Sequence, residues 1–240
     1  MDVASFLGRV GRALARMDEE GPPRLEVLWP YSPGSPERLG LVSGSFDPMT
    51  MAHAALAEAL GARADLVLFL YSPRTFPKEA GPGGKPREPL LLPRDRVASL
   101  LAYSRSRPRL GVALCSHGLY ADQAEAAARA FPGAELFFGV GSDKLVQLAD
   151  PAWYEDPQVA LDRLFSLARV AYAVRKDQDE RLATALAGLG RWKDRIEELD
   201  LPPDLAELSS RGVREQLARG GDINGLVPTE ILPFVERRPR

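Results

Sequence analysis

From residue 39 onward, short apolar segments typical of buried strands alternate with segments whose apolar residues recur at helical spacing. The expected strands are RLGLVSG (38–44), DLVLFLY (65–71), LGVALC (110–115), AELFFGVG (134–141) and ARVAYAV (168–174). The expected helices between them are MAHAALAEALGA (51–62), PRDRVASLLAYS (93–104), ADQAEAAARAF (121–131) and QVALDRLFSLA (158–168). Right-handed crossovers then place helices on both faces of a parallel sheet. We therefore predict an α/β fold with a doubly wound parallel sheet, whose ligand site lies where the strands end.

Residues 1–38 precede this alternation, and we expect them to form a helical and extended appendage to a main domain at 39–240. Apolar residues between 3 and 18 follow helical spacing, with arginines on the other face, and RLEVLW after them is a possible strand. The prolines and glycine of PYSPGSPE then indicate a turn-rich connection. The helix can pack on the sheet or cover its edge, or it can bind a partner protein.

The composition excludes several classes of function. The net charge is −2, which argues against nucleic acid or an anionic membrane as a partner. No apolar run approaches the roughly 18 to 20 residues that a membrane helix needs. Cys115 is the single cysteine, so an internal disulfide is impossible and a reducing compartment is favoured. We therefore expect a cytoplasmic protein, and formation of a homo-oligomer stays open.

The stretch LVSGSFDPMTMAH (41–53) joins the first of these strands to the first helix. The strand breaks at Gly44, the helix begins near Thr50, and His53 follows on its first turn. Free backbone N–H groups and the positive end of the helix dipole favour an anion at such a turn, and the histidine ring can donate to the same place. The stretch therefore predicts a phosphate site, although a first-turn histidine can also be a polar surface residue and Thr50 can be a helix cap.

The same stretch resembles a family signature. GSFDPMTMAH is similar to the G-x-F-x-P-x-[HT]-x-G-H pattern of the nucleotidyltransferase superfamily, whose members join an adenylyl or cytidylyl group to a phosphate. The residues in register are Gly44, Phe46, Pro48, Thr50 and His53, with Ser45 inside the turn. Ala52 replaces the usual glycine, and threonine at position 50 is similar to the pantetheine-phosphate adenylyltransferases. The resemblance implies a Rossmann-like nucleotidyltransferase fold and a nucleotide at this turn.

A second signature lies near the C-terminus. LSSRGVR (208–214) resembles the I-S-S-T-x-I-R motif of the nicotinate and nicotinamide mononucleotide adenylyltransferases, with Ser209, Ser210, Val213 and Arg214 in register. A serine at a helix N-terminus and an arginine one turn later can hold the polyphosphate of a nucleoside triphosphate. Taken alone, this pattern also fits an ordinary helix cap followed by a solvated arginine.

A third stretch, from FFGVGSDKL to AYAVR, is similar to the segment I-G-x-D-x-L-x-x-L-x-x-W of the same family and the residues that follow it. Gly141, Asp143, Trp153 and Arg175 match. The resemblance implies that Gly141 and Asp143 lie beside the nucleotides, that Trp153 stacks on the pyridine ring of the acceptor, and that Arg175 is an acceptor residue. Trp153 can instead be a core aromatic residue.

One loop departs from the family. Where its members carry S-Y-T-x-x-T-L, this chain has SHGLYADQAEA, so His117 and Tyr120 are the candidates for a different contact with the acceptor. His117 can equally face water. The loop at 76–89, FPKEAGPGGKPREP, is too rich in glycine and proline for a helix or strand, and its Lys78 is a candidate for closing over the phosphates.

The reaction implied is adenylyl transfer from ATP to nicotinate or nicotinamide mononucleotide, with release of pyrophosphate and with Mg²⁺ carried by ATP rather than by protein ligands. Such transfer depends on positioning and on neutralising charge, and we expect His53, Thr50 and Arg214 to be the catalytic residues. Cys115 and His117 lie two residues apart, and no third group is identified to orient the histidine, which argues against a thiol nucleophile. Another acceptor such as phosphopantetheine and a catalytically silent, nucleotide-binding regulator stay open as alternatives.

Overall fold

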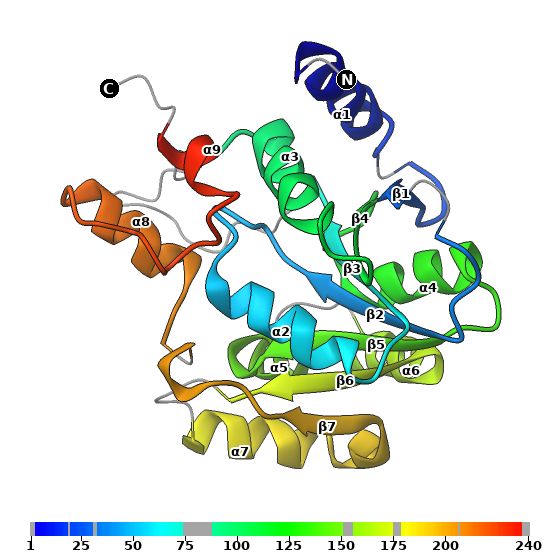
Figure 1. Cartoon of the computed structure of the whole chain (residues 1–240). Helices are drawn as coiled ribbons and strands as arrows, with labels where there is room; N and C mark the ends of the chain where they lie inside the picture. The colour runs from blue at the N-terminus through cyan, green and yellow to red at the C-terminus, as the bar shows by residue number, and fades with distance from the viewer. Residues whose placement is uncertain are drawn as a thin grey trace.

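The strands of the described residues form one sheet of seven strands in the order β1-β4-β3-β2-β5-β6-β7 (Figure 1). This computed structural model describes residues 3–18, 20–30, 33–73, 88–150, 156–174, 179–205 and 207–236. The strands are β1 (Leu25–Trp29), β2 (Arg38–Ser43), β3 (Leu66–Tyr71), β4 (Leu110–Cys115), β5 (Glu135–Gly141), β6 (Ala168–Ala173) and β7 (Ile196–Leu199). All pairs from β2 to β7 are parallel, and β1 pairs antiparallel with β4 at one edge.

The order from β4 to β7 confirms the predicted doubly wound topology. β2 is the first strand of the parallel part, and the chain passes from β2 to β3 and β4 on one side and to β5, β6 and β7 on the other. The carboxyl ends of β2 and β5 therefore form the point where the strand order reverses. In a doubly wound sheet this is where ligands bind.

Helices cover both faces of the sheet (Figure 1). In the described residues they are α1 (Val3–Ala15), α2 (Met51–Gly61), α3 (Pro93–Ser104), α4 (Tyr120–Ala130), α5 (Ser142–Ala149), α6 (Pro157–Leu167), α7 (Asp179–Gly188), α8 (Ser210–Ala218) and α9 (Leu232–Glu236), with 3₁₀ turns at Gly190–Arg195 and Pro203–Leu205. α1, α2, α3, α8 and α9 pack on one face, and α4, α5, α6 and α7 on the other. The four predicted helices are confirmed as α2, α3, α4 and α6.

Two hydrophobic cores follow from the period-two alternation of the strands. In β3, Leu66, Leu68 and Leu70 face α4 to α7, whereas Val67, Phe69 and Tyr71 face α2 and α3. Gly40 in β2 allows α2 to lie close to the sheet, because a Cβ atom at that position would lie 2.8 Å from Leu60 of α2. This close packing fixes the helix that begins at the predicted phosphate turn.

The N-terminal segment contacts the rest of the chain through both of its elements. α1 packs against α3, and Val10, Ala13 and Met17 are buried in the same core as Leu100 of α3. The predicted strand at RLEVLW is confirmed as β1, an edge strand of the sheet. α1 thus packs on the domain, while the division of the chain at residue 38 stays a prediction.

Candidate functional site

The turn between β2 and α2 lies at the carboxyl edge of the sheet and is shaped by a glycine and a phenylalanine. The Gly44 N–H donates to the Leu70 carbonyl at 3.3 Å, which extends the β2–β3 pairing by one residue. Phe46 has a φ of +46° and is fully buried. A Cβ atom on Gly44 would lie 3.1 Å from the Phe46 ring. A side chain at position 44 would therefore press on the aromatic ring, which folds back over the glycine and would have to shift slightly.

Thr50 is the N-cap residue of α2 and is bonded to His53 on the first turn. The Thr50 N–H donates to Nδ1 of His53 at 3.1 Å, and the Thr50 hydroxyl lies 2.8 Å from the same nitrogen. A backbone N–H can only donate, so Nδ1 must be the acceptor and the neutral ring carries its proton on Nε2. Thr50 is fully buried, whereas His53 is partly exposed. Thr50 thus fixes the ring and makes Nε2–H the donor side of the imidazole.

Asp47 connects this turn to the start of α3, a role that the sequence analysis did not predict. Its carboxylate accepts the backbone N–H groups of Leu90 and Leu91 at 3.0 and 2.7 Å. The Arg96 guanidinium of α3 lies 3.4 Å from the same carboxylate, and both side chains are 9% exposed. The ion pair is therefore largely removed from water and is sensitive to the loss of either partner.

Arg96 holds the turn at further points. Its Nε donates to the Leu91 carbonyl at 2.9 Å, and one terminal nitrogen donates to the Ser45 carbonyl at 3.1 Å. Burial raises the pKa of the neighbouring Tyr71 hydroxyl, which stays protonated at neutral pH. The sequence held one signal for Arg96: it lies on the same helical face as Leu100, four residues later, and is therefore a charge directed at the core.

The second motif lies directly against this turn, although its residues are more than 160 positions away (Figure 1). Ser209 caps α8 by accepting the Gly212 N–H at 3.1 Å. The Ser210 hydroxyl donates to the Pro48 carbonyl at 2.7 Å, and Arg214 donates to the Asp47 carbonyl at 2.6 Å. The Arg214 side chain is 14% exposed, so it is not a solvated surface arginine.

Four other predicted site residues lie at the same edge of the sheet, where other strands end. Gly141 ends β5 and is the N-cap of α5, and Asp143 lies in the first turn of α5. Because β5 pairs with β2, this helix start is adjacent to the turn. His117 and Tyr120 follow β4, which is separated from β2 by β3.

His117 contacts its neighbour in the chain, whereas Tyr120 packs against a residue of β5. The His117 Nδ1 lies 2.9 Å from the Ser116 hydroxyl, and the Tyr120 ring packs edge-on against Phe138 at 5.3 Å between centroids. Their role toward an acceptor stays a prediction. Lys78, Trp153 and Arg175 lie outside the described residues, as does most of the loop at 76–89.

Cys115 is fully buried in the core on the other face of the sheet. Burial raises the pKa of its thiol to about 11, so the thiol is protonated at neutral pH. A nucleophilic cysteine needs the thiolate form. The structure therefore agrees with the sequence argument against thiol chemistry.

Two absences hold for the parts of the chain that the structure describes. Within them, no helix is long and apolar enough to cross a membrane. Within the same residues, no three histidine, cysteine, aspartate or glutamate side chains are grouped so that they can hold a metal ion.

Similar proteins are found among curated sequences and among solved structures. A scan against models of protein families finds no match. A probable nicotinate-nucleotide adenylyltransferase of Chromohalobacter salexigens is 32% identical over 221 residues, covering 82% of this chain and 92% of the relative. The protein of the same name from Thermomicrobium roseum is 26% identical over 205 residues, covering 83% of this chain and 89% of the relative.

Among solved structures, the nicotinic acid mononucleotide adenylyltransferase of Plasmodium falciparum, complexed with APC, superposes with a TM-score of 0.58. It covers 84% of this chain and 95% of that chain at 14% identity, and it supports the nucleotidyltransferase fold. The bacterial relatives also show the family, because one of them is more than 30% identical over most of both chains. The chain belongs to the nicotinate-nucleotide adenylyltransferase family.

Proposed function

We propose that this protein transfers the adenylyl group of ATP to nicotinate mononucleotide, releasing pyrophosphate, as a step of NAD biosynthesis. The observation that carries the proposal is the contact between the two motifs, in which Ser210 and Arg214 of α8 are bonded to the carbonyls of the turn that bears His53. It brings a helix N-terminus, a guanidinium and an imidazole donor to the same sheet edge. These groups suit a nucleoside triphosphate.

The chemistry needs no covalent intermediate on the protein. A phosphate oxygen of the acceptor attacks the α-phosphorus of ATP, and the bond to the pyrophosphate oxygen breaks. The protein positions the reactants and donates to oxygens on which charge develops. In our proposal Nε2–H of His53 donates to the transferred phosphate, Arg214 contacts the β- and γ-phosphates, and Mg²⁺ enters with ATP as part of the substrate.

The names of the relatives favour the acid form of the mononucleotide as acceptor. The altered loop with His117 and Tyr120 leaves the choice between nicotinate and nicotinamide to experiment. We propose that the reaction takes place in the cytoplasm, because a chain of 240 residues with one cysteine cannot form an internal disulfide and fits a reducing compartment.

The test supplies the purified protein with ATP, Mg²⁺ and one acceptor at a time, and follows pyrophosphate release and the mass of the product. The acceptors are nicotinate mononucleotide, nicotinamide mononucleotide and phosphopantetheine. We expect the highest kcat/KM with nicotinate mononucleotide. Turnover only with phosphopantetheine would contradict the acceptor, and ATP binding without turnover on any acceptor would indicate a silent regulator.

Thr50→Val is expected to lower both the stability and the rate. The valine keeps the shape but removes the hydroxyl near Nδ1 of His53, and loss of an N-cap side chain costs about 0.5 to 2 kcal/mol of unfolding free energy. We expect kcat to fall by about tenfold because the imidazole is held by one donor instead of two. Thr50→Ser retains the hydroxyl and should retain both properties.

The matched control is Thr184→Val on α7. Thr184 is exposed, and its hydroxyl donates to the Glu180 carbonyl at 2.9 Å. α7 packs on the other face of the sheet from α2. Unfolding by denaturant gives the stability, and steady-state kinetics give the rate per folded molecule. If Thr50→Val unfolds more easily but turns over at the wild-type rate, Thr50 is a helix cap alone.

Arg214→Lys is expected to raise the KM for ATP by about tenfold, because a single ammonium cannot serve the Asp47 carbonyl and a phosphate in the way that a planar guanidinium can. AMP lacks the β- and γ-phosphates, so its binding as an inhibitor should change much less. Arg211→Lys is the control, since Arg211 lies on the same helix, is exposed and pairs with Glu215 at 2.9 Å. Equal losses for ATP and AMP would place Arg214 away from the terminal phosphates.

A further inference from the structure

The loop after β4, residues 116–119, lies at the same edge of the sheet as the turn that bears His53. β4 pairs in parallel with β3, and β3 pairs with β2, so the ends of β2 and β4 are two strand spacings apart, about 10 Å. A mononucleotide can span this distance, with its phosphate at the turn and its ring at the loop. Ser116 is fully buried, whereas His117 is partly exposed. The loop therefore offers an imidazole at the place where the ring of such a ligand would end.

Ser116 joins this loop to the N-terminal strand β1. Its N–H donates to the Arg24 carbonyl at 3.0 Å, and the Arg24 N–H donates to the Ser116 hydroxyl oxygen at 2.9 Å. Leu25 of β1 lies opposite Cys115 of β4, so the two bonds continue the pairing of these strands by one residue. The second bond needs a side chain with an acceptor, such as a hydroxyl, at position 116.

The same hydroxyl fixes the ring of His117. Its oxygen accepts from Arg24, so its proton remains to be donated, and Nδ1 of His117 lies 2.9 Å away. A buried hydroxyl needs an acceptor for its proton, because water does not reach it. We therefore assign Ser116 as the donor to Nδ1, which leaves the proton of the neutral ring on Nε2. Nε2–H is then the donor side of His117, as it is in His53.

Gln123 of α4 holds the backbone of the loop. Its side-chain Nε2 donates to the carbonyls of His117 at 3.3 Å and of Gly118 at 3.2 Å. The residue is 1% exposed, and within the described part of the chain its Oε1 has no hydrogen-bond partner. A buried oxygen without a partner lowers stability. The glutamine is thus unfavourable for the core around it, whereas its amide satisfies two carbonyls of the loop.

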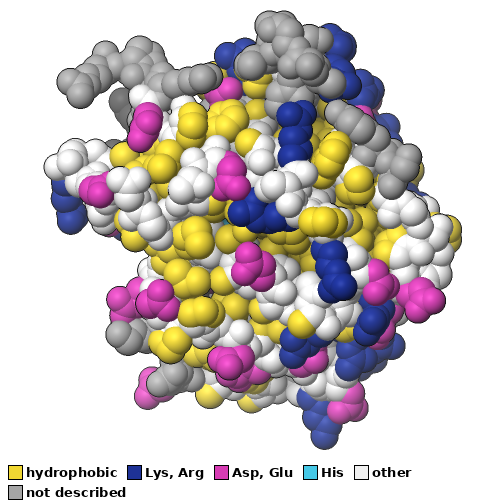
Figure 2. Space-filling view, viewed as in Figure 1, with side chains coloured by type: hydrophobic (Ala, Val, Ile, Leu, Met, Phe, Trp, Pro, Cys, Tyr) yellow, Lys and Arg dark blue, Asp and Glu magenta, His cyan; other side chains and the backbone are white. Residues whose placement is uncertain are grey.

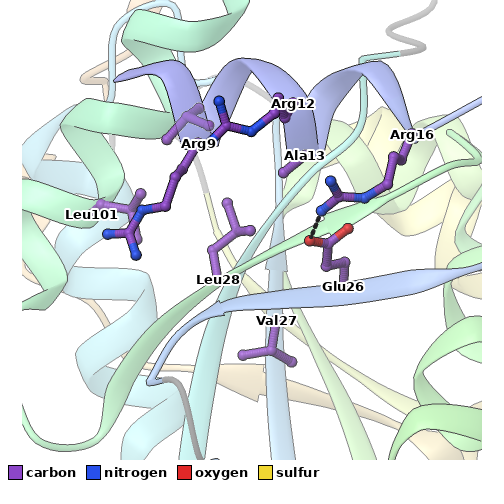
Figure 3. Close-up of a pocket in the computed structure, with 9 residues that line it drawn as sticks. Arg9, Arg12, Ala13, Arg16, Glu26, Val27, Leu28 and Leu101 are labelled. Carbon is purple, nitrogen blue, oxygen red and sulfur yellow. Dashed lines mark hydrogen bonds and ion pairs between the residues drawn. The ribbon is translucent and has the colours of Figure 1, made fainter. Parts of the chain in front are cut away.

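The N-terminal segment is attached on both sides of β1 and can therefore support the loop. Figure 3 shows Leu28 directed from β1 toward α1 and Val27 directed to the other side, and these side chains pack against different cores. Arg16 of α1 forms an ion pair with Glu26 of β1. In Figure 2, dark blue side chains gather at the top right, in the region where Figure 1 places α1, so the basic side of this helix faces outward. Arg24, directly before β1, is thus held beside the loop.

We propose that the acceptor site extends to β1: Ser116, which β1 holds, and Gln123 are positioning residues that direct Nε2–H of His117 at the carboxylate of a nicotinate ring. The inference rests on the proposed function and adds to it the residues that select the acceptor. A hydrogen bond to a carboxylate is about twice as strong as one to a neutral amide oxygen. The arrangement therefore favours the acid mononucleotide over the amide.

Steady-state kinetics of the full chain, with ATP and each mononucleotide in turn, test the role of His117. His117→Ala should raise the KM for nicotinate mononucleotide by about tenfold, a loss of about 1.4 kcal/mol, and the KM for nicotinamide mononucleotide much less. The KM for ATP and kcat should stay near their wild-type values. Equal losses for the two mononucleotides would show that His117 does not select the carboxylate, and the inference would be wrong.

Ser116→Ala and Gln123→Met test the two positioning residues. Each should raise the KM for nicotinate mononucleotide selectively, and neither should add to the loss in His117→Ala, because both act through that ring. Gln123→Met also removes the oxygen without a partner, so it should keep or raise the unfolding midpoint while it raises the KM. A residue that only stabilised the fold would not separate these two properties, and this variant carries the test should Ser116→Ala fail to fold.

Ser104→Ala is the control for the loss of a buried hydroxyl. Ser104 lies in the last turn of α3 and is fully buried, and its hydroxyl has no hydrogen-bond partner among the residues that the structure describes. Its KM values should equal those of the wild type. A wild-type protein that turns over neither mononucleotide would overturn the proposed function and this inference with it. Wild-type turnover with unchanged KM values in Ser116→Ala and Gln123→Met would overturn the inference alone.

Discussion

We expect His53→Ala to lower kcat for adenylyl transfer by about a hundredfold or more, which is the size of effect seen when one donor to a developing oxyanion is removed. The structure explains why this donor is single: Nδ1 is occupied by the Thr50 N–H, so only Nε2–H can serve the substrate. The measurement is steady-state pyrophosphate release with ATP and nicotinate mononucleotide. The second histidine gives the comparison: His117 follows β4 and is a candidate for the acceptor, so His117→Ala should act on the KM for the acceptor and change kcat far less.

Two isosteric variants separate catalysis from capping. His53→Asn places an amide oxygen near the position of Nδ1, so it should keep the bond from the Thr50 N–H and the wild-type unfolding midpoint while losing the rate. His53→Gln places an amide N–H near the position of Nε2, so it should recover part of the rate at lower stability. Full activity in His53→Asn would show that the imidazole does not act on the substrate.

We expect Arg96→Met to destabilise the protein by up to about 3 to 5 kcal/mol, the cost of removing one partner of a buried ion pair. Arg214, 3.9 Å from the same carboxylate, is the cation that remains. The Asp47 and Arg96 side chains are each 9% exposed, so water offers little compensation. Denaturant unfolding measures the loss, and kcat should fall as well because the Ser45 and Leu91 carbonyls lose their donors. Arg94→Met is the control on the same helix, since the Arg94 side chain is 57% exposed.

A double-mutant cycle with Asp47→Asn tests the ion pair itself. Asparagine removes the charge that Arg96 compensates, so the double variant should be more stable than Arg96→Met alone. It also provides a folded sample should Arg96→Met fail to fold. Strictly additive losses would mean that Arg96 acts through the two carbonyls and not through the carboxylate.

Most of the sheet could be predicted because its central strands are buried on both faces and therefore read as continuous apolar runs. β7 was missed: its sequence, IEEL, has two glutamates in four residues and resembles a polar loop. α5 was missed because its eight residues are too few for a clear helical period. β1 was expected as a strand, but its antiparallel pairing with β4 depends on contacts between distant segments that local patterns do not report.

Part of the candidate site could likewise be predicted from local sequence patterns, and part could not. The residues of the two motifs could be placed because glycine, threonine and histidine have local roles at a strand-to-helix turn. The roles of Asp47 and Arg96 could not be predicted, since Arg96 bonds two backbone carbonyls and one carboxylate that come from two separate segments, the turn at 44–50 and the residues before α3. Backbone partners leave no trace in residue identity, and only the folded chain shows that these segments meet.

The bonds around the turn also bear on how the chain can diversify. The connection from β3 to α3 leaves the sheet just after Leu70, whose carbonyl is bonded to Gly44, and it returns at Leu90 and Leu91, which are bonded to Asp47. Both ends are thus anchored to the same short turn. We therefore expect a change in the length of this connection to leave the His53 imidazole in place, because the bonds of Leu70, Leu90 and Leu91 hold the turn from both ends of the connection.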